Sequence, residues 1–286
     1  MPSLIDIRRR IRSVKNTEQI TKAMKMVSAA KLRRAQDRVI SARPYGSMLR
    51  KILGNVAAAV ANDENVGKNP LLAQRPEQRI LLVLVTSDKG LAGAFNTNLI
   101  KAAQRFAAEH KDASVQMVLI GRKGRDFFRK RGAAVVSDHI NMASKLVYAD
   151  VAAIAGKAME LYRNEEIDAV YLIYNEFKSV VAQTLLTSKV LPIQLPEQAN
   201  PVDYIFEQPP GAMLDALLPR YVETEFYRAL AESTAAEHAA RMTAMEAATS
   251  NAGDMIDKLT LYMNRVRQAS ITKEIIEVVS GAAAAE

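Results

Sequence analysis

Residues 220–280 read RYVETEFYRALAESTAAEHAARMTAMEAATSNAGDMIDKLTLYMNRVRQASITKEIIEVVS, and this stretch decides the fold. It contains no proline and a single glycine, Gly253. At an α-helical rise of about 1.5 Å per residue, it predicts a helix roughly 90 Å long. Residues 3–43 also lack glycine and proline, which predicts a second helix of roughly 60 Å. Helical stretches this long point to a coiled coil, a membrane span or a repeat array.

A coiled coil fits the two stretches best. Neither contains about 18 consecutive apolar residues, as a membrane span requires, and no repeat of fixed period recurs along the chain. The C-terminal stretch has apolar or small residues spaced alternately by three and four, the pattern of a heptad seam. The predicted seam residues are Met242, Met245, Thr249, Ala252, Ile256, Leu259, Met263 and Val266.

The N-terminal stretch is less regular. Its apolar residues fall into three groups with slips between them, which predicts local changes of winding. The groups are Ile7, Ile11 and Val14; Ile20, Met24 and Val27; and Leu32, Ala35 and Val39. Ser3 and Asp6 match a capping box that begins the helix. Two long helices at opposite ends of one chain most simply pair antiparallel with each other.

The middle of the chain alternates between strand and helix patterns. This alternation predicts βαβ units, hence a Rossmann-like domain with a mostly parallel sheet. The strand candidates are Arg79–Thr86, Val115–Ile120, Ala133–Val136, Ala169–Tyr174 and Val180–Leu191; the last two are joined closely, as in a hairpin. The helix candidates are Phe95–Glu109, Arg122–Lys130 and Leu146–Arg163.

The predicted fold class is therefore α+β, with an antiparallel coiled coil and a central α/β domain. The expected organisation is an N-terminal coiled-coil helix (1–61), a joint (62–77), the α/β domain (78–191), a second joint (192–211) and a C-terminal coiled-coil helix (212–286). The joints are rich in Pro, Asn and Gln, which favours irregular structure.

Composition limits the possible chemistry. The chain has no cysteine, which excludes disulfides, zinc–thiolate sites and thiol catalysis. The basic start MPSLIDIRRR has no apolar segment behind it, so we expect no secretory signal and an intracellular protein. Aromatic residues make up only 6% of the chain, whereas alanine and methionine, which suit close helix packing, are common.

Charge is distributed unevenly along the chain. Residues 1–51 carry a net charge of +11, and the remainder carries −3. A basic helix of this kind indicates a polyanionic partner, although a solvated helix face made of good helix formers explains the charge equally well. No aromatic residue precedes Tyr45, so this helix offers no platform for stacking nucleic-acid bases.

Motifs for catalysis or cofactor binding are weak. Residues 86–96 (TSDKGLAGAFN) and 121–124 (GRKG) follow predicted strands. Neither matches a dinucleotide or P-loop motif, so tight turns are favoured over phosphate sites. The three histidines, His110, His139 and His238, have no metal-like or triad-like spacing to a carboxylate. Ser87 lacks the surroundings of a nucleophile elbow. We therefore expect no catalytic residue, cofactor or metal site.

Both ends of the chain nevertheless carry long, specific motifs. They are NTEQITKAMKMVSAAKL at 16–32, RMTAM at 241–245 with AAT at 247–249, and LTL at 259–261 with Asn264 and RQASITKEI at 267–275; SDKGL at 87–91 accompanies them. Through these motifs the chain resembles the gamma-subunit family of F-type ATP synthases, and the resemblance extends over its whole length.

The resemblance implies a fold and a role. The terminal helices would form a left-handed coiled coil inside a ring of alternating alpha and beta subunits, and the α/β domain would lie against the epsilon subunit and the membrane c ring. Proton flow would turn the chain, and its faces would drive the catalytic beta subunits through open, loose and tight states. Residues expected to contact the beta subunits are Met24, Lys25, Lys31, Arg241, Arg267, Gln268 and Thr272.

The same resemblance implies a peripheral protein without membrane insertion or nucleic-acid binding. It would lie at the cytoplasmic face of a bacterial inner membrane, or at the matrix face if organellar. The apolar end, residues 275–285, suits a tip turning in an apolar collar, although a frayed end fits as well. Because the chain lacks cysteine, the regulatory cysteine pair of chloroplast-type members is excluded.

Two other functions remain open at the level of sequence. A Rossmann-like hydrolase or phosphotransferase using the loop at residues 88–96 predicts that the isolated chain binds nucleotide. A nucleic-acid-binding coiled coil using the basic N-terminal helix predicts duplex binding with a steep salt dependence.

Overall fold

The computed structural model describes residues 3–59, 69–195 and 208–283. These residues form two compact units. The α/β unit comprises residues 29–241, and the two-helix unit comprises residues up to Ser28 and from Met242 onward. The two longest helices each contribute residues to both units. Among the described residues, no helix is long and apolar enough to span a membrane.

The terminal helices are longer than any other element. Helix α1 runs from Leu4 to Ala59 and continues through Pro44. Helix α5 runs from Pro210 to Ala283 and continues through Pro219. The predicted capping box is confirmed, since the Asp6 backbone N–H donates to Ser3 Oγ at 3.2 Å and Ser3 Oγ donates to the Asp6 carboxylate at 2.9 Å. The first bond satisfies a backbone donor that the first turn of a helix leaves free, and the second holds the Ser3 hydroxyl in place to accept it.

The α/β unit is built on one five-stranded sheet. Its strands are β1 (Arg79–Val85), β2 (Ser114–Ile120), β3 (Val135–His139), β4 (Ala169–Phe177) and β5 (Gln183–Leu191). The spatial order is β3-β2-β1-β4-β5. Strands β1 to β4 are parallel, whereas β5 is antiparallel to β4. The predicted mostly parallel sheet with a terminal hairpin is therefore confirmed.

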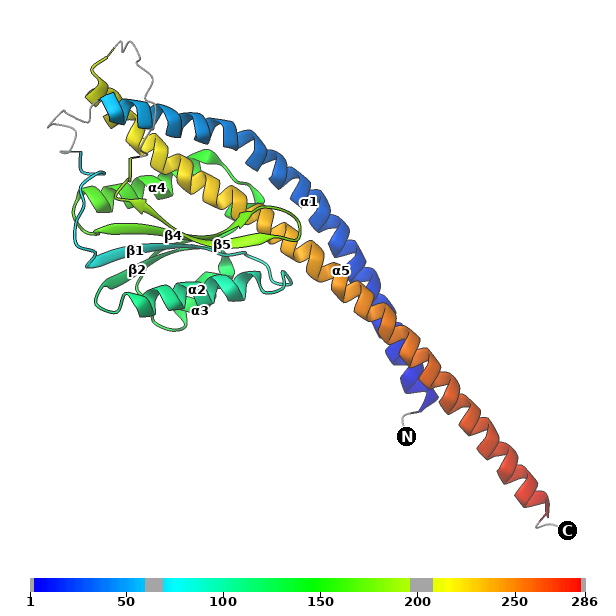
Figure 1. The fold of residues 1–286 in the computed structure, drawn as a ribbon. Coiled ribbons are helices and arrows are strands. Elements are labelled where there is room, and N and C mark those ends of the chain that lie inside the picture. Colours follow the sequence, from blue (N-terminus) through cyan, green and yellow to red (C-terminus); the bar gives the residue numbers. More distant parts are fainter. Residues whose placement is uncertain (1–2, 60–68, 196–207, 284–286) are drawn as a thin grey trace. The chain divides into compact units, whose positions relative to one another are not determined.

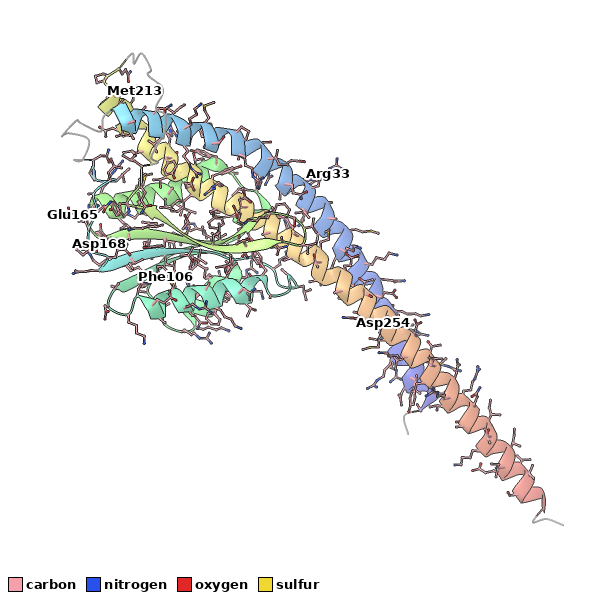
Figure 2. All side chains as sticks on the ribbon, in the orientation of Figure 1. Arg33, Phe106, Glu165, Asp168, Met213 and Asp254 are labelled. Atoms are coloured by element: carbon pink, nitrogen blue, oxygen red, sulfur yellow. The ribbon has the colours of Figure 1, made fainter. Side chains whose placement is uncertain are left out.

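Helices cover both faces of this sheet. Figure 1 shows α2 (Phe95–Glu109) and α3 (Arg122–Arg129) on one face and α4 (Tyr148–Arg163) on the other. A short 3₁₀ turn, η2 (Met142–Ser144), leads into α4. Phe106 of α2 faces the sheet, where its ring lies 4.9 Å from the ring of Tyr171 (Figure 2).

Coverage of both faces explains the sequence of the central strand. In β1 the side chains of Leu81, Leu82, Val83 and Leu84 are all fully buried. A strand buried on both faces is expected to be apolar without alternation, which is why RILLVLV lacks the period of two seen in half-exposed strands. The core of the unit therefore lies on both sides of β1.

The observed bounds of strand β3 differ from the predicted ones. Strand β3 begins two residues later than predicted and extends to His139. It is an edge strand that contains Ser137, Asp138 and His139, and polar residues of this kind do not stand out as a strand in a sequence. Of the predicted joints at 62–77 and 192–211, residues 62–68 and 196–207 lie outside the described residues.

The topology places one loop at a special position. The chain moves outward from β1 to β2 and β3, and then returns to β4 on the other side of β1. In a doubly wound sheet, ligands bind where the strand order reverses, beyond the carboxyl ends of the strands. Here that position is occupied by the loop after β1, residues 86–94, which we call the glycine loop.

Candidate functional site

The helix pair in the two-helix unit is held together by a narrow seam. All eight predicted seam residues of α5 are buried or half-buried, and Met245 and Ala252 are the most enclosed. On α1 the enclosed positions include Ile7, Thr21 and Ser28. Charged side chains such as Asp254 are exposed to solvent. The pattern is that of two helices packed along one stripe each.

The seam of α1 does not slip as the sequence indicated. Within the described residues of the two-helix unit, the enclosed positions of α1 keep the alternation of three and four: Leu4, Ile7, Ile11, Val14, Glu18, Thr21, Lys25 and Ser28. Ile20 and Val27 are instead 60% and 56% exposed. The predicted change of winding is therefore wrong there.

Small polar residues replace the missing apolar ones in this seam. The hydroxyls of Thr21 and Thr249 lie 2.7 Å apart, and Ser28 Oγ donates to the Met24 carbonyl at 2.8 Å. Lys25 Nζ pairs with Glu246 Oε1 at 2.7 Å beside them. Short side chains with satisfied hydroxyls allow the helices to approach closely without a buried polar penalty. The heptad is thus continuous although its apolar pattern is not.

The residues predicted to contact partners occupy different environments. Met24 is half-buried, and Lys25 is tied to Glu246 of α5. Lys31, Arg267, Gln268 and Thr272 are exposed. Thr272 Oγ1 donates to the Gln268 carbonyl one turn earlier in the same helix, at 3.0 Å. Met24 and Lys25 are thus partly covered within the chain, whereas the four exposed residues are open to a partner.

Arg241 differs from the other predicted contact residues. Only 8% of the residue is exposed. Its guanidinium donates to the carbonyls of Gly90 at 3.2 Å and Lys89 at 3.1 Å, and it pairs with Glu237 at 2.9 Å. All its described partners therefore belong to the α/β unit of this chain. We reassign Arg241 from partner contact to internal anchoring of the glycine loop.

Burial changes the ionisation of the groups beside this arginine. Desolvation raises the pKa of the Glu237 carboxyl, and the Arg241 charge opposes that change. Desolvation, together with the charges of Arg241 and Lys31, lowers the pKa of His238 to about 4. His238 is consequently neutral at pH 7, so its imidazole adds no positive charge beside Arg241 and Lys31.

The glycine loop is not shaped to receive a phosphate. The Asp88 carboxylate already accepts the backbone N–H groups of Arg122, at the start of α3, and Asn141, at 3.1 and 2.9 Å. A helix start occupied by the chain's own carboxylate has no room for a second anion. Asn96 Oδ1 likewise accepts the Ser87 backbone N–H at 3.0 Å. The Asp88 carboxylate and the Ser87 backbone N–H are therefore both used within the chain.

The crevice beside the loop is filled by α5. The space enclosed there is only about 10 Å³, and α5 lines it with Leu230, Ser233, Thr234 and Glu237. Gly121, with a φ of +94°, packs against the neighbouring strand end, and only glycine can do so. A Cβ atom at this position would lie 2.1 Å from the Thr86 carbonyl oxygen. The motif at 121–124 thus serves tight packing. A nucleotide-binding enzyme working through this loop is not supported.

Sequence reasoning missed a basic hollow next to the glycine loop. A space of about 220 Å³ is bordered by Lys31, Arg34 and Arg38 of α1 and by Lys89, together with Arg241 and Glu237. The spacing 31, 34, 38 places the first three on one face of a helix. That spacing was available in the sequence, but only Lys31 was selected from it.

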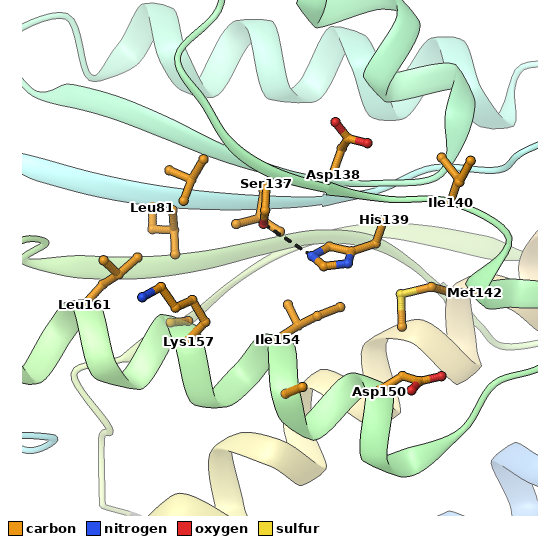
Figure 3. Close-up of a pocket in the computed structure, with 14 residues that line it drawn as sticks. Leu81, Ser137, Asp138, His139, Ile140, Met142, Asp150, Ile154, Lys157 and Leu161 are labelled. Atoms are coloured by element: carbon orange, nitrogen blue, oxygen red, sulfur yellow. Dashed lines mark hydrogen bonds between the residues drawn. The ribbon is translucent and has the colours of Figure 1, made fainter.

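A second hollow lies between β3 and α4. It encloses about 530 Å³, and its lining is mainly apolar, with Leu81, Val118, Ile154 and Leu161. Figure 3 shows His139 and Ser137 facing the hollow from the strand, with their side chains 3.3 Å apart. Burial lowers the pKa of His139, opposed by the Asp138 charge. Among the described residues, no group of three or more potential metal ligands occurs here or elsewhere.

Comparison with known proteins agrees with these features. Residues 3–285 match the family model described as ATP synthase. The gamma chain of ATP synthase from Solibacter usitatus (strain Ellin6076) is 77% identical over 286 residues, with 100% of both chains covered. The corresponding chain from Anaeromyxobacter sp. (strain Fw109-5) is 51% identical, with 99% of both chains covered.

Solved structures show the same architecture. A chain from the central stalk and c-ring structure of Tetrahymena thermophila mitochondrial ATP synthase has a TM-score of 0.62 at 27% identity; the match covers 80% of this chain and 99% of that one. A chain from the Euglena gracilis mitochondrial ATP synthase, with a TM-score of 0.67 at 19% identity, shares the fold over 98% of this chain and 94% of its own. The class defined by this fold is thus the central stalk of ATP synthases. Within that class, the chain belongs to the ATP synthase gamma chain family.

Proposed function

We propose that this chain is the rotor shaft that couples proton flow through a membrane c ring to ATP synthesis at catalytic beta subunits. Family membership supports this role most directly. Within the structure, the supporting observation is a two-helix unit with a narrow seam and unusually apolar outer faces. Such faces on an otherwise charged helix pair indicate that partners cover them.

The end of α5 carries the largest of these faces. Every residue from Ile271 to Gly281 is exposed. The large apolar residues among them, 48% to 71% exposed, are Ile271, Ile275, Ile276, Val278 and Val279. Burying these apolar side chains against a partner would lower their free energy relative to leaving them in water. We propose that the alpha and beta subunits form an apolar collar around this segment.

The proposed contacts with the beta subunits are two half-buried residues of α1, Met24 and Lys25, and four exposed polar residues of the two helices. They comprise Met24, Lys25, Lys31, Arg267, Gln268 and Thr272, without Arg241. Lys31 borders the basic hollow with Arg34 and Arg38, and we propose that acidic loops of the beta subunits approach this region. Screening by salt would weaken such contacts.

The α/β unit is proposed to contact the epsilon subunit and the c ring. The similar structures from Tetrahymena thermophila and Euglena gracilis include a c ring, which supports an assembly of this kind. In it the chain would be peripheral, at the cytoplasmic face of a bacterial inner membrane or the matrix face of an organelle. The reaction itself would take place on the beta subunits, and this chain would carry no catalytic residue.

The proposed mechanism is a coupling of binding free energies between distant sites. Rotation would present different faces of the shaft to each beta subunit in turn, so that its nucleotide affinity changes in sequence. Such coupling is reciprocal, so ATP hydrolysis would drive the shaft in the opposite direction.

A native pull-down of the tagged chain from membranes of its host, at moderate salt, tests this function. Co-elution of two nucleotide-binding subunits, each in molar excess over this chain and with ATPase activity, is the expected result. Recovery of the chain alone or with nucleic acid would contradict the proposal. Reversing the charges of Lys31, Arg34 and Arg38 should then reduce co-elution most strongly at low salt, and the difference from the wild type should shrink as salt is raised.

A further inference from the structure

Two groups of hydrogen bonds attach α5 to the carboxyl ends of the parallel strands, and the function proposed above does not account for either group. The first joins Glu232 of α5 to Phe177, the last residue of β4, and to Arg43 of α1. The second is the bonding of Arg241 to the glycine loop after β1. All of these residues lie within the α/β unit.

The first attachment is a closed arrangement of three elements. The two oxygens of the Glu232 carboxylate accept from the Phe177 backbone N–H at 3.0 Å and from Arg43 Nη2 at 3.3 Å. The same Arg43 nitrogen donates to the Phe177 carbonyl at 3.4 Å. The Glu232 side chain is only 6% exposed. We call these three residues the Glu232 clasp.

The energetics of the clasp favour a single geometry. A buried carboxylate with both oxygens bonded is stable only while both donors remain in place, because losing one leaves a desolvated charge. The Arg50–Glu225 pair at 3.0 Å repeats the α1–α5 contact seven residues away on each helix. Two turns of helix separate these pairs, so they lie on the same faces.

The second attachment reaches the opposite side of α5. Nine residues separate Glu232 from Arg241, which is two and a half helical turns. Their side chains therefore leave α5 in roughly opposite directions, with one bound at the end of β4 and the other at the loop after β1. A helix held from opposite sides resists rotation about its own axis more than a helix attached along one stripe.

We propose that the Glu232 clasp and the Arg241 anchor transmit torque between the α/β unit and α5. This inference rests on the proposed rotor function and extends it by naming the residues through which the torque passes. Glu232, Arg43 and Arg241 are positioning residues, since they keep α5 from turning relative to the sheet. They take no part in chemistry.

The test uses the assembled ATP synthase containing this chain in inverted membrane vesicles. ATP hydrolysis and ATP-driven proton uptake are measured in the same vesicles. The variants are Arg43→Ala and Arg241→Gln, with Arg43→Lys as the conservative variant. Lys157→Ala is the matched control, because Lys157 pairs with Glu160 inside α4 and has no bond to the described residues of α5.

We expect both disruptive variants to pump about three- to tenfold fewer protons per ATP hydrolysed, the fold-change that corresponds to the net contribution of one ordinary hydrogen bond. Arg43→Lys should recover part of the ratio, and Lys157→Ala should leave it unchanged. A merely structural role would lower the amount of assembled complex without altering the ratio.

The outcomes separate the two proposals. If wild-type vesicles hydrolyse ATP without acidification, the proposed rotor function fails. If they do acidify and both disruptive variants keep the wild-type ratio, the torque role of the clasp and anchor is overturned. Arg43 is half-exposed, with 54% of its side chain accessible, so Arg43→Ala is expected to assemble even if Arg241→Gln does not.

Discussion

The two units of this chain bury apolar surface in opposite ways. In the α/β unit, the side chains of Leu81 to Leu84 are fully buried between helices on both faces of the sheet. In the two-helix unit, the seam includes Thr21 and Ser28, whereas Ile20 and Val27 face outward. The α/β unit thus satisfies its apolar surface internally. The two-helix unit leaves much of its apolar surface exposed and open to partners, as a shaft inside a ring of subunits would.

The largest expected effect is a core truncation in the α/β unit. Leu82→Ala removes a side chain with no solvent exposure, and such truncations cost about 3 kcal/mol of unfolding free energy. Leu261→Ala in the two-helix unit is the control, because Leu261 is 61% exposed and should cost less than about 0.5 kcal/mol. Denaturant unfolding of the full chain measures both. Equal losses would contradict the contrast between the units.

Acid should affect the α/β unit first. All three histidines lie there, and the pKa of His238 is lowered from 6.5 to about 4. The unfolded chain therefore binds a proton that the folded chain excludes, so the unfolding free energy falls as pH drops from 6.5 towards 4. Between pH 7 and pH 4.5, we expect the unfolding free energy of His238→Gln to fall by about 2 kcal/mol less than that of the wild type.

Denaturant unfolding of both proteins at pH 7 and pH 4.5 checks the histidine prediction. The comparison between the two proteins is needed because the raised pKa of Glu237 acts in the opposite direction, with a contribution that falls as pH rises through its folded value. Parallel pH profiles for the wild type and His238→Gln would show that His238 is not the group responsible.

A smaller effect is expected from the polar seam of the two-helix unit. Thr21→Val keeps the shape of the side chain but removes the hydroxyl pair with Thr249. The expected loss is about 1 kcal/mol, seen in thermal unfolding followed by helical circular dichroism. Thr260→Val is the matched control, because Thr260 Oγ1 donates only to the Ile256 carbonyl of its own helix among its described contacts. If the two variants behave alike, the cross-helix pair contributes nothing.

The smallest effect on the isolated chain should come from Ile275→Ala. Ile275 is 58% exposed, so the unfolding free energy should change by less than about 0.5 kcal/mol. Assembly should nevertheless suffer if alpha and beta subunits cover this residue, and the recovered ratio of those subunits in the pull-down measures it. Unchanged stability together with unchanged recovery would show that the end of α5 is uncovered.

Sequence patterns predicted the α/β unit well because its signals are strong. A fully buried strand such as RILLVLV and helices with regular periodicity identify themselves. The edge strand β3 was displaced, since Ser137, Asp138 and His139 are polar and half-buried. The seam of α1 was misread for a related reason. Outward apolar residues such as Ile20, which is 60% exposed, imitate a core position in the sequence.

The candidate site was less predictable than the fold. Exposed contact residues such as Arg267 were selected through resemblance, and their roles stay predictions. Arg241 was likewise assigned to a partner through resemblance. Nothing in the local sequence indicates that its guanidinium binds two carbonyls some 150 residues earlier in the chain. The Glu232 clasp depends on similarly distant contacts.

The most direct test of the rotor function is to watch the chain turn. Because the chain has no cysteine, Lys111→Cys on the exposed turn after α2 provides a single attachment point for an optical probe. The complex is fixed to a surface through its beta subunits and supplied with ATP. Stepwise rotation of the probe in one direction is the predicted result. ATP hydrolysis without net rotation of the probe would contradict the account.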